Sequence, residues 1–183
     1  MTPTQLQCQK FLSELLKNKI PVSNGVAQSV SNSFCHLTSG YELDPVQILR
    51  DGCLPAKAKA KDIIRIKNVK FFSLCEHHLL PFHGTASIFY VPTKNIAGLG
   101  KFPQALAALS LRLQLQETLT QQLAAAIEKA LAPKACAVTL DAFHFCLSMR
   151  GAKERDARMQ TLTLRGEWKL EPKTFAALAK LLK

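Results

Sequence analysis

The chain has 183 residues, a mass of 20.2 kDa and the size of a single domain. Its 48% hydrophobic and 20% charged residues exclude a wholly disordered protein, and no apolar run approaches the roughly 20 residues that span a bilayer. The net charge of +11 indicates an anionic partner, but 7% aromatic residues supply few rings for stacking on nucleic acid. With no secretory signal and too few cysteines for a disulfide scaffold, we expect a cytoplasmic protein that does not bind membranes.

The N-terminal segment, residues 1–40, is predicted to be helical. Apolar side chains recur at helical spacing over residues 6–16. Ser23 or Asn24 can cap a second helix, which Gly40 would close. The following residues, 41–62, contain prolines, a glycine and a KAKAKD run, and are expected to form an irregular linker.

The rest of the chain alternates between strand and helix patterns. The predicted elements, in chain order, are strands at 62–74 and 85–92, helical residues 103–131 (as one helix or as two broken at 117–118), strands at 136–150 and 159–169, and a helix at 175–182. This order predicts an α+β fold built from antiparallel hairpins. So few strands leave sheet edges unpaired, which favours an oligomer.

Cysteines and histidines gather at two places. Cys75 and His78 lie three residues apart in CEHH, where a turn can aim both at one point. In the later predicted strand, alternation would put His144, Cys146, Ser148 and Arg150 on one face. Thiolate and imidazole are preferred zinc ligands, so Cys75, His78 and Cys146 are candidates for a three-ligand site with an open position, as in catalytic zinc centres.

Other interpretations of these residues remain open. Histidines on strands are often hydrogen-bonded core residues, and a redox cysteine pair or a nucleophilic cysteine with a histidine base would use the same side chains. The remaining cysteines are expected to be small buried hydrophobic residues; they are Cys8, Cys35, Cys53 and Cys136.

Four segments together resemble one known family. SLCEHHLLPFHG, GLGK, QLQETLTQQLAAAI and HFCLSMRG occur in the order and spacing of GTP cyclohydrolase I, over about residues 40–168. The resemblance implies a tunnelling fold (T-fold), in which antiparallel hairpins with packed helices join between subunits into a β-barrel toroid. It further implies a homo-oligomer, commonly a decamer, with sites at subunit interfaces. Residues 41–183 would form the catalytic domain behind the N-terminal helical segment.

The resemblance also implies roles for individual residues. Zn²⁺ would be held by Cys75, His78 and Cys146, and His77 and His144 would transfer protons. The implied substrate-binding residues are Gln116, Glu117, Lys101 and Arg150. The implied reaction is zinc-dependent opening of the guanine imidazole ring of GTP, with release of formate and formation of 7,8-dihydroneopterin triphosphate, a pterin on the route to folates.

The phosphate-binding positions depart from the family. Gly100 replaces a serine, Gln104 replaces an arginine, and Gly25 aligns with another arginine. Charge-assisted hydrogen bonds contribute about 1.5–3 kcal/mol each, so we expect weaker triphosphate binding unless other basic residues compensate; the candidates are Lys153, Arg155 and Arg158.

These departures leave three alternatives to a GTP cyclohydrolase. The first is a paralogue that acts on a less phosphorylated purine or a pterin. The second is a catalytically silent, zinc-stabilised subunit, although such a subunit needs neither His77 nor His144. Nucleic-acid binding is the third, and the clustering of the basic residues around the expected anion site argues against it.

Overall fold

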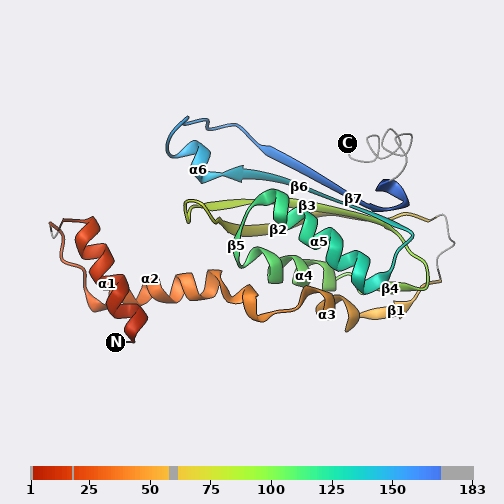
Figure 1. Cartoon of the computed structure of the whole chain (residues 1–183), viewed down its shortest axis with the longest axis horizontal. Helices are drawn as coiled ribbons and strands as arrows, with labels where there is room; N and C mark the ends of the chain where they lie inside the picture. Colours follow the sequence, from red (N-terminus) through yellow and green to blue (C-terminus); the bar gives the residue numbers. More distant parts are fainter. Residues whose placement is uncertain (1, 18, 58–61, 170–183) are drawn as a thin grey trace. The chain divides into compact units, whose positions relative to one another are not determined.

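The computed structural model describes residues 2–17, 19–57 and 62–169 (Figure 1). It contains two compact units, Met1–Ser39 and Gly40–Lys183. In the first unit, the predicted helices are α1 (Pro3–Leu15) and α2 (Asn24–Leu37), which pack against each other. Hydroxyl caps start both helices, because Thr2 accepts a hydrogen bond from the backbone N–H of Gln5 and Ser23 accepts one from that of Val26.

Gly40 does not close the second helix as predicted. That helix ends at Leu37, and Gly40 lies in a short 3-10 turn, η1 (Ser39–Glu42). A Cβ at Gly40 would lie 2.5 Å from the carbonyl oxygen of Ala108, so the position requires glycine for close backbone approach rather than for helix capping.

The predicted linker is largely structured, which corrects the sequence interpretation. It contains the second half of η1, the helix α3 (Pro45–Arg50) and the strand β1 (Cys53–Pro55), while residues 58–61 lie outside the described part of the chain. Asp44 caps α3 by accepting from the backbone N–H of Val46. The helix packs against two longer helices and buries Leu49 completely, so tertiary packing rather than intrinsic propensity stabilises it.

A five-stranded sheet of order β5-β2-β3-β6-β7 forms the centre of the second unit. Its strands are β2 (Ile64–Cys75), β3 (Pro81–Val91), β5 (Leu113–Gln114), β6 (Ala135–His144) and β7 (Met159–Gly166). Pairing is antiparallel from β2 to β7, and β5 runs parallel to β2. A second sheet pairs β1 with β4 (Asn95–Ala97), and η2 (Glu167–Lys169) follows β7. The α+β prediction with antiparallel hairpins is confirmed, and the predicted C-terminal helix lies outside the described residues.

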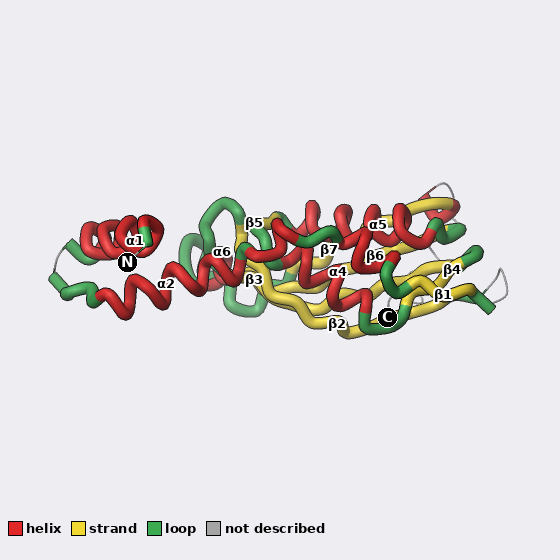
Figure 2. Tube along the Cα trace, turned by 90° about the horizontal axis from the view of Figure 1, so that it is seen from below, coloured by secondary structure: helices red, strands yellow, loops and turns green. Residues whose placement is uncertain are grey.

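Two helices cover one face of this sheet, as Figures 1 and 2 show. They are α4 (Lys101–Ser110) and α5 (Gln116–Leu131). The predicted helical stretch therefore breaks at β5, before residues 117–118. The break is stabilised by side chains, because Arg112 donates to the carbonyls of Ala108 and Gly40, and Gln114 donates to that of Leu109. Among the described helices, none is long and apolar enough to cross a membrane.

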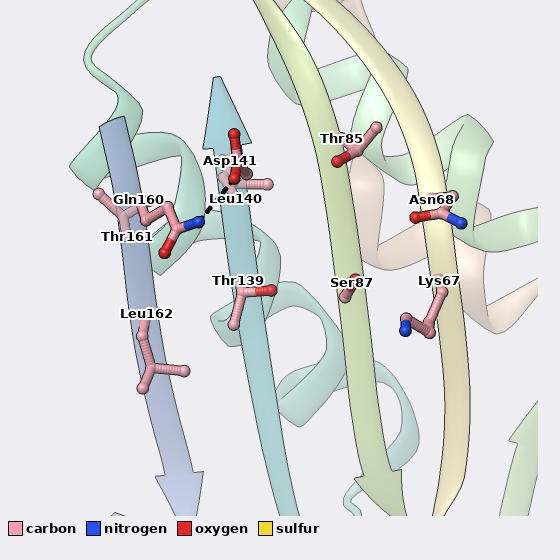
Figure 3. Close-up of a pocket in the computed structure, with 10 residues that line it drawn as sticks. All are labelled: Lys67, Asn68, Thr85, Ser87, Thr139, Leu140, Asp141, Gln160, Thr161 and Leu162. Carbon is pink, nitrogen blue, oxygen red and sulfur yellow. Dashed lines mark hydrogen bonds between the residues drawn. The ribbon is translucent and has the colours of Figure 1, made fainter. Parts of the chain in front are cut away.

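The opposite face of the sheet carries a polar groove. Side chains from four strands line it, including Lys67, Thr85, Ser87 and Asp141 (Figure 3). A β-bulge between Ile66 and Val69 distorts the edge of the groove. The helix-facing residues of the same strands form the apolar core, so the two faces alternate along each strand.

The strand predicted over residues 136–150 ends early. β6 stops at His144, and a short helix, α6 (Phe145–Ser148), follows. The last pair of the ladder joins His144 to Phe82, because β3 begins at Pro81, which has no N–H to continue the pairing. The prediction that His144, Cys146, Ser148 and Arg150 share one strand face is therefore wrong beyond His144.

The close approach of β3 and β6 predicts a strict requirement for glycine at position 84. A Cβ there would lie 1.9 Å from the carbonyl oxygen of Asp141, so Gly84→Ala forces apart two paired strands. We expect a loss of about 3 kcal/mol or more in the free energy of unfolding, measured with urea. Gly100→Ala, which meets no atom within 4 Å, is the control and should change stability by less than about 1 kcal/mol. Equal stabilities of the two variants would contradict this packing.

Candidate metal and proton-transfer site

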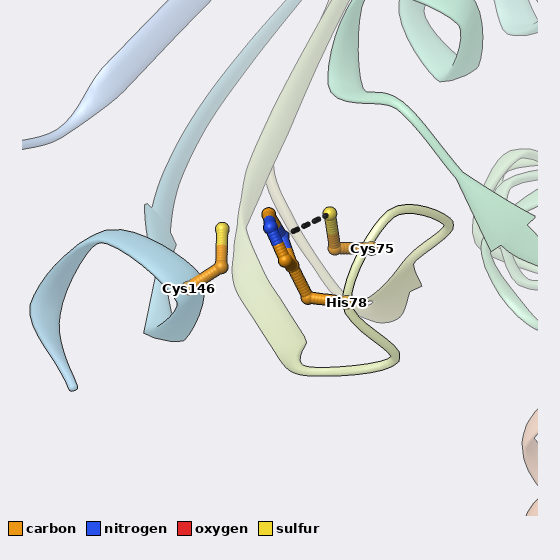
Figure 4. Close-up of side chains that lie close together, drawn as sticks. All are labelled: Cys75, His78 and Cys146. Carbon is orange, nitrogen blue, oxygen red and sulfur yellow. Dashed lines mark hydrogen bonds between the residues drawn. The ribbon is translucent and has the colours of Figure 1, made fainter. Parts of the chain in front are cut away.

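The CEHH turn brings Cys75 and His78 together at the end of β2. The carbonyl of Cys75 accepts hydrogen bonds from the backbone N–H groups of His78 (3.3 Å) and Leu79 (2.8 Å), while its own N–H donates to Leu80. Leu79 takes a left-handed conformation with φ of 54°. The turn places Nδ1 of His78 3.7 Å from Sγ of Cys75 (Figure 4). The predicted convergence of these two side chains is confirmed.

Cys146 completes the cluster from α6. The ligand atoms of Cys75, His78 and Cys146 all lie within 4.8 Å of one another, and Figure 4 shows the three side chains converging. Zinc–sulfur bonds of about 2.3 Å in a tetrahedral site separate two sulfurs by roughly 3.8 Å. The ligand atoms would need to approach one another by about 1 Å to reach this spacing. Two thiols and one imidazole are also ligands that zinc prefers, so the cluster fits a zinc ion.

The electrostatics of the two thiols also fit a cation. Burial raises the pKa of the Cys146 thiol, the neighbouring Cys75 raises it further, and the positive charge of Arg150 opposes both effects. Two adjacent thiols do not both ionise readily in a partly buried site. A bound metal cation would remove this obstacle by stabilising both thiolates.

His144 ends β6, two residues before Cys146. Its ring stacks on Phe82 with centroids 4.7 Å apart and an interplanar angle of 4°. Its Nε2 lies 2.8 Å from Oε1 of Gln116. Burial lowers the pKa of His144, and the carboxylate of Glu117 partly opposes that shift. The imidazole is therefore mostly neutral near pH 7, as a residue that accepts a proton requires.

Gln116 and Glu117 begin α5 but differ in environment. Gln116 is 1% exposed, and its amide group donates to the carbonyls of Leu140 and Met159 and to Oγ1 of Thr161. Glu117 is exposed. A carboxylate is favourable in the first turn of a helix and is available to a ligand there. The substrate-binding roles of both residues stay predictions.

The remaining predicted site residues divide into two groups. His77 is exposed in the CEHH turn, with its ring 5.9 Å from that of His78, and Arg150 is close enough to influence Cys146. Lys101 lies elsewhere, at the start of α4, where it packs over Gly52. Ten helical residues, about 15 Å, separate it from the end of the sheet that carries Cys75 (Figure 1). Within one chain, Lys101 therefore does not lie near Cys75, His78 and Cys146.

Sequence reasoning missed three residues that support His144: Phe82, Thr120 and Thr161. Oγ1 of Thr120 donates to the carbonyl of Gln116 at 2.7 Å and lies 2.6 Å from Oγ1 of Thr161. The spacing of Thr120, four residues after Gln116 on one helix face, is a signal that could have indicated it. No local pattern points to Thr161.

The family profile and the sequence relatives point to one family. The family profile described as GTP cyclohydrolase I matches residues 13–183. The "GTP cyclohydrolase 1" of Deinococcus radiodurans is 37% identical over 149 residues, 81% of this chain and 68% of that protein. The protein of the same name from Leptospira biflexa is 33% identical over 180 residues, 96% of this chain and 97% of that protein. A crystal structure of the archaeosine synthase QueF-Like in the apo form aligns with a TM-score of 0.48 and 17% identity, covering 60% of this chain and 97% of that chain.

All four cysteines outside the cluster were expected to be buried, but only one of them is. Cys136 is buried, Cys8 and Cys53 are half-buried, and Cys35 is exposed, which corrects the expectation for that residue. Burial raises the pKa of Cys136 to about 12, with Glu128 adding to the shift and Arg165 opposing it. Cys136 is therefore a structural residue of the core.

This difference predicts the alkylation pattern of the native protein. At pH 8 the thiolate fraction of Cys136 is on the order of 10⁻⁴, and the side chain is inaccessible. We expect iodoacetamide to modify Cys35 and to leave Cys136 unmodified, as measured by peptide mass spectrometry. Both should react after denaturation, which is the control. Equal labelling of Cys35 and Cys136 in the folded protein would contradict the burial of Cys136.

Proposed function

This chain belongs to the GTP cyclohydrolase I family and is an enzyme, and on that premise we propose that it hydrolyses GTP to formate and 7,8-dihydroneopterin triphosphate. The reaction opens the imidazole ring of guanine and removes its C8. The observation that supports this most is the convergence of Cys75, His78 and Cys146, with the neutral imidazole of His144 only two residues before Cys146. A structural metal site would not need the histidine.

Zinc is the proposed metal, held by Cys75, His78 and Cys146. When bound, it would supply a Lewis acid that activates water for attack at C8. Arg150, which favours the ionised form of Cys146, would help to keep that ligand a thiolate.

His144 is the proposed proton-transfer residue for ring opening. Its neutral imidazole can take a proton from the attacking water and return it to the ring nitrogen that leaves C8. His77, exposed in the same turn as His78, is proposed to serve the later rearrangement of the ribose.

Glu117 is the proposed recognition group for guanine. A carboxylate accepts hydrogen bonds from N1–H and the 2-amino group together, and adenine offers no such pair of donors. Glu117 is exposed and near enough to His144 to influence its pKa, so the two proposed roles would be carried out in one region.

The position of Lys101 supports a site shared between subunits. Because Lys101 and the metal cluster lie at different ends of the second unit, a phosphate-binding Lys101 would serve the site of another copy of the chain. We propose that copies join in a T-fold toroid, commonly a decamer in this family, so that Lys101 of one subunit completes the site of another.

The start of α4 favours a second candidate substrate, a guanine nucleotide with fewer phosphates. Gly100 begins the helix with no side-chain cap and no atom within 4 Å of a Cβ, and Gln104 is exposed one turn later. Arg158 does not substitute freely for the missing arginine, because Asp141 binds it in an ion pair. Lys153 and Arg155 remain as exposed cations.

The metal hypothesis predicts about one zinc per chain in protein purified without chelators, measured by elemental analysis. Cys146→Ala should lose most of this zinc because one of three ligands is gone. Cys53→Ala removes another half-buried thiol outside the cluster and should retain it. Wild-type protein without any transition metal would contradict the hypothesis.

The phosphate departures predict a weak preference for the triphosphate. Kinetics with GTP, GDP, GMP and guanosine, followed by formate release, should give kcat/KM values for the three nucleotides within about tenfold of each other, since each missing charged contact is worth roughly tenfold or more. The double variant Gly100→Ser/Gln104→Arg should raise the preference for GTP. ATP should release no formate. A steep GTP preference in the wild type would show that other residues replace the clamp, and no formate from any guanine compound would refute the cyclohydrolase proposal.

A further inference from the structure

We propose that Gln116 is a positioning residue that fixes His144 in one tautomer, with its proton on Nε2 and its lone pair on Nδ1. The chemical use of that tautomer rests on the proposed function, but the tautomer itself is a property of the folded chain. The proposal follows from the hydrogen bonds around the Gln116 amide, which determine its orientation.

The amide of Gln116 has one orientation that its surroundings accept. Nε2 faces the carbonyl oxygens of Leu140 (3.2 Å) and Met159 (2.9 Å), which can only accept hydrogen bonds. If the amide were turned over, Oε1 would face these two oxygens without an intervening hydrogen. The side chain is 1% exposed, so water cannot relieve that repulsion. The NH₂ group must therefore point to β6 and β7, and Oε1 must point to His144.

The hydroxyl groups of Thr120 and Thr161 determine which group donates and which accepts in each hydrogen bond of this network. Thr120 uses its hydroxyl proton to donate to the carbonyl of Gln116 at 2.7 Å. It must then accept from Thr161, whose Oγ1 lies 2.6 Å away. The hydroxyl of Thr161, having donated its proton, is left as an acceptor for Nε2 of Gln116 at 3.1 Å. The two amide hydrogens of Gln116 are shared among three acceptors, and turning the amide over would leave both carbonyl oxygens facing Oε1 without a donor.

The orientation of the amide sets the protonation of the histidine. Oε1 of Gln116 is an acceptor only, and Nε2 of His144 lies 2.8 Å from it, so Nε2 must carry a proton. In neutral imidazole the other nitrogen is then unprotonated. Phe82 stacks on the ring and opposes its rotation. Among the described residues, none forms a hydrogen bond with Nδ1, so this nitrogen is free for chemistry.

In this tautomer, Nδ1 of His144 is the atom that accepts and donates the proton. Nδ1 of neutral His144 accepts a proton from the attacking water, and the imidazolium then carries N–H groups on both nitrogens. The same proton leaves Nδ1 for the purine nitrogen whose bond to C8 breaks, which restores the neutral tautomer. Nε2 keeps its proton throughout, because Gln116 remains an acceptor.

A direct role of Gln116 in binding guanine is the competing interpretation. It requires amide hydrogens that are free to reach the substrate, whereas both face acceptors within the chain. A binding role predicts that loss of the amide raises KM. A positioning role predicts that it lowers kcat.

The tautomer can be measured without any turnover. Solid-state ¹⁵N and ¹³C NMR of protein with labelled histidine distinguishes protonated from unprotonated ring nitrogens, and the chain has five histidines to assign. At pH 8.5, about two units above the usual imidazole pKa, we expect His144 to carry its proton on Nε2 alone. A wild-type signal from a proton on Nδ1 would overturn the proposal, whatever the activity.

Two matched variants test the role of Gln116. Gln116→Met keeps the length of the side chain and should give a mixture of His144 tautomers, a fall in kcat of tenfold or more and a KM within threefold of wild type. Gln114→Met removes an equally buried glutamine, one that donates to Leu109 and Gln122, and should leave tautomer and kcat unchanged. A single unchanged tautomer in Gln116→Met, or a change confined to KM, would contradict the positioning role. No formate from the wild type combined with the expected tautomer would refute the proposed function alone.

Discussion

The pairing of β3 with β6 is the constraint on which the site depends. The two strands stay in one antiparallel register from Val91 and Ala135 to Phe82 and His144. Because side chains alternate with a period of two, a slip of one residue would turn His144 to the groove face and carry Cys146 away from Cys75. The burial of the sheet against α4 and α5 opposes any such slip. Apolar packing in the middle of the sheet thus determines where the polar atoms at its end lie.

The sequence predicts the site well wherever the relation between residues is local. Cys75 and His78 are three residues apart in a turn, so their convergence follows from spacing. Alternation separates His144 from Phe143 on opposite faces of β6, but only the packed helices show that His144 lies on the helix-facing side with Leu140 and Ala142. The same reasoning fails for Cys146, because β6 ends opposite the start of β3 at Pro81. Cys146 therefore lies in the helix α6 and not in a strand. Cys146 does join the cluster as predicted, but it does so from a helix and not from a strand.

Contacts between distant segments explain what the sequence could not reveal. The helix α3 was missed because its six residues depend on burying Leu49 against other helices, not on a periodic pattern. Thr161 lies 45 residues from Gln116, and nothing in its neighbourhood marks its hydroxyl as a hydrogen-bond partner of a helix residue. Buried polar groups must be satisfied in the folded chain, but the fold alone decides which partners do so.

The open space around Gly100 has a consequence for how this enzyme can evolve. A side chain at Gly100 would meet no neighbouring atom, so substitutions at this position cost little folding free energy and are nearly neutral for the scaffold. Changes at Gln116 or Gly84, in contrast, disturb buried partners and are selected against whatever the substrate. If the start of α4 binds phosphate as proposed, a change of phosphorylated substrate at Gly100 would leave the stability of the fold and the buried surroundings of His144 intact.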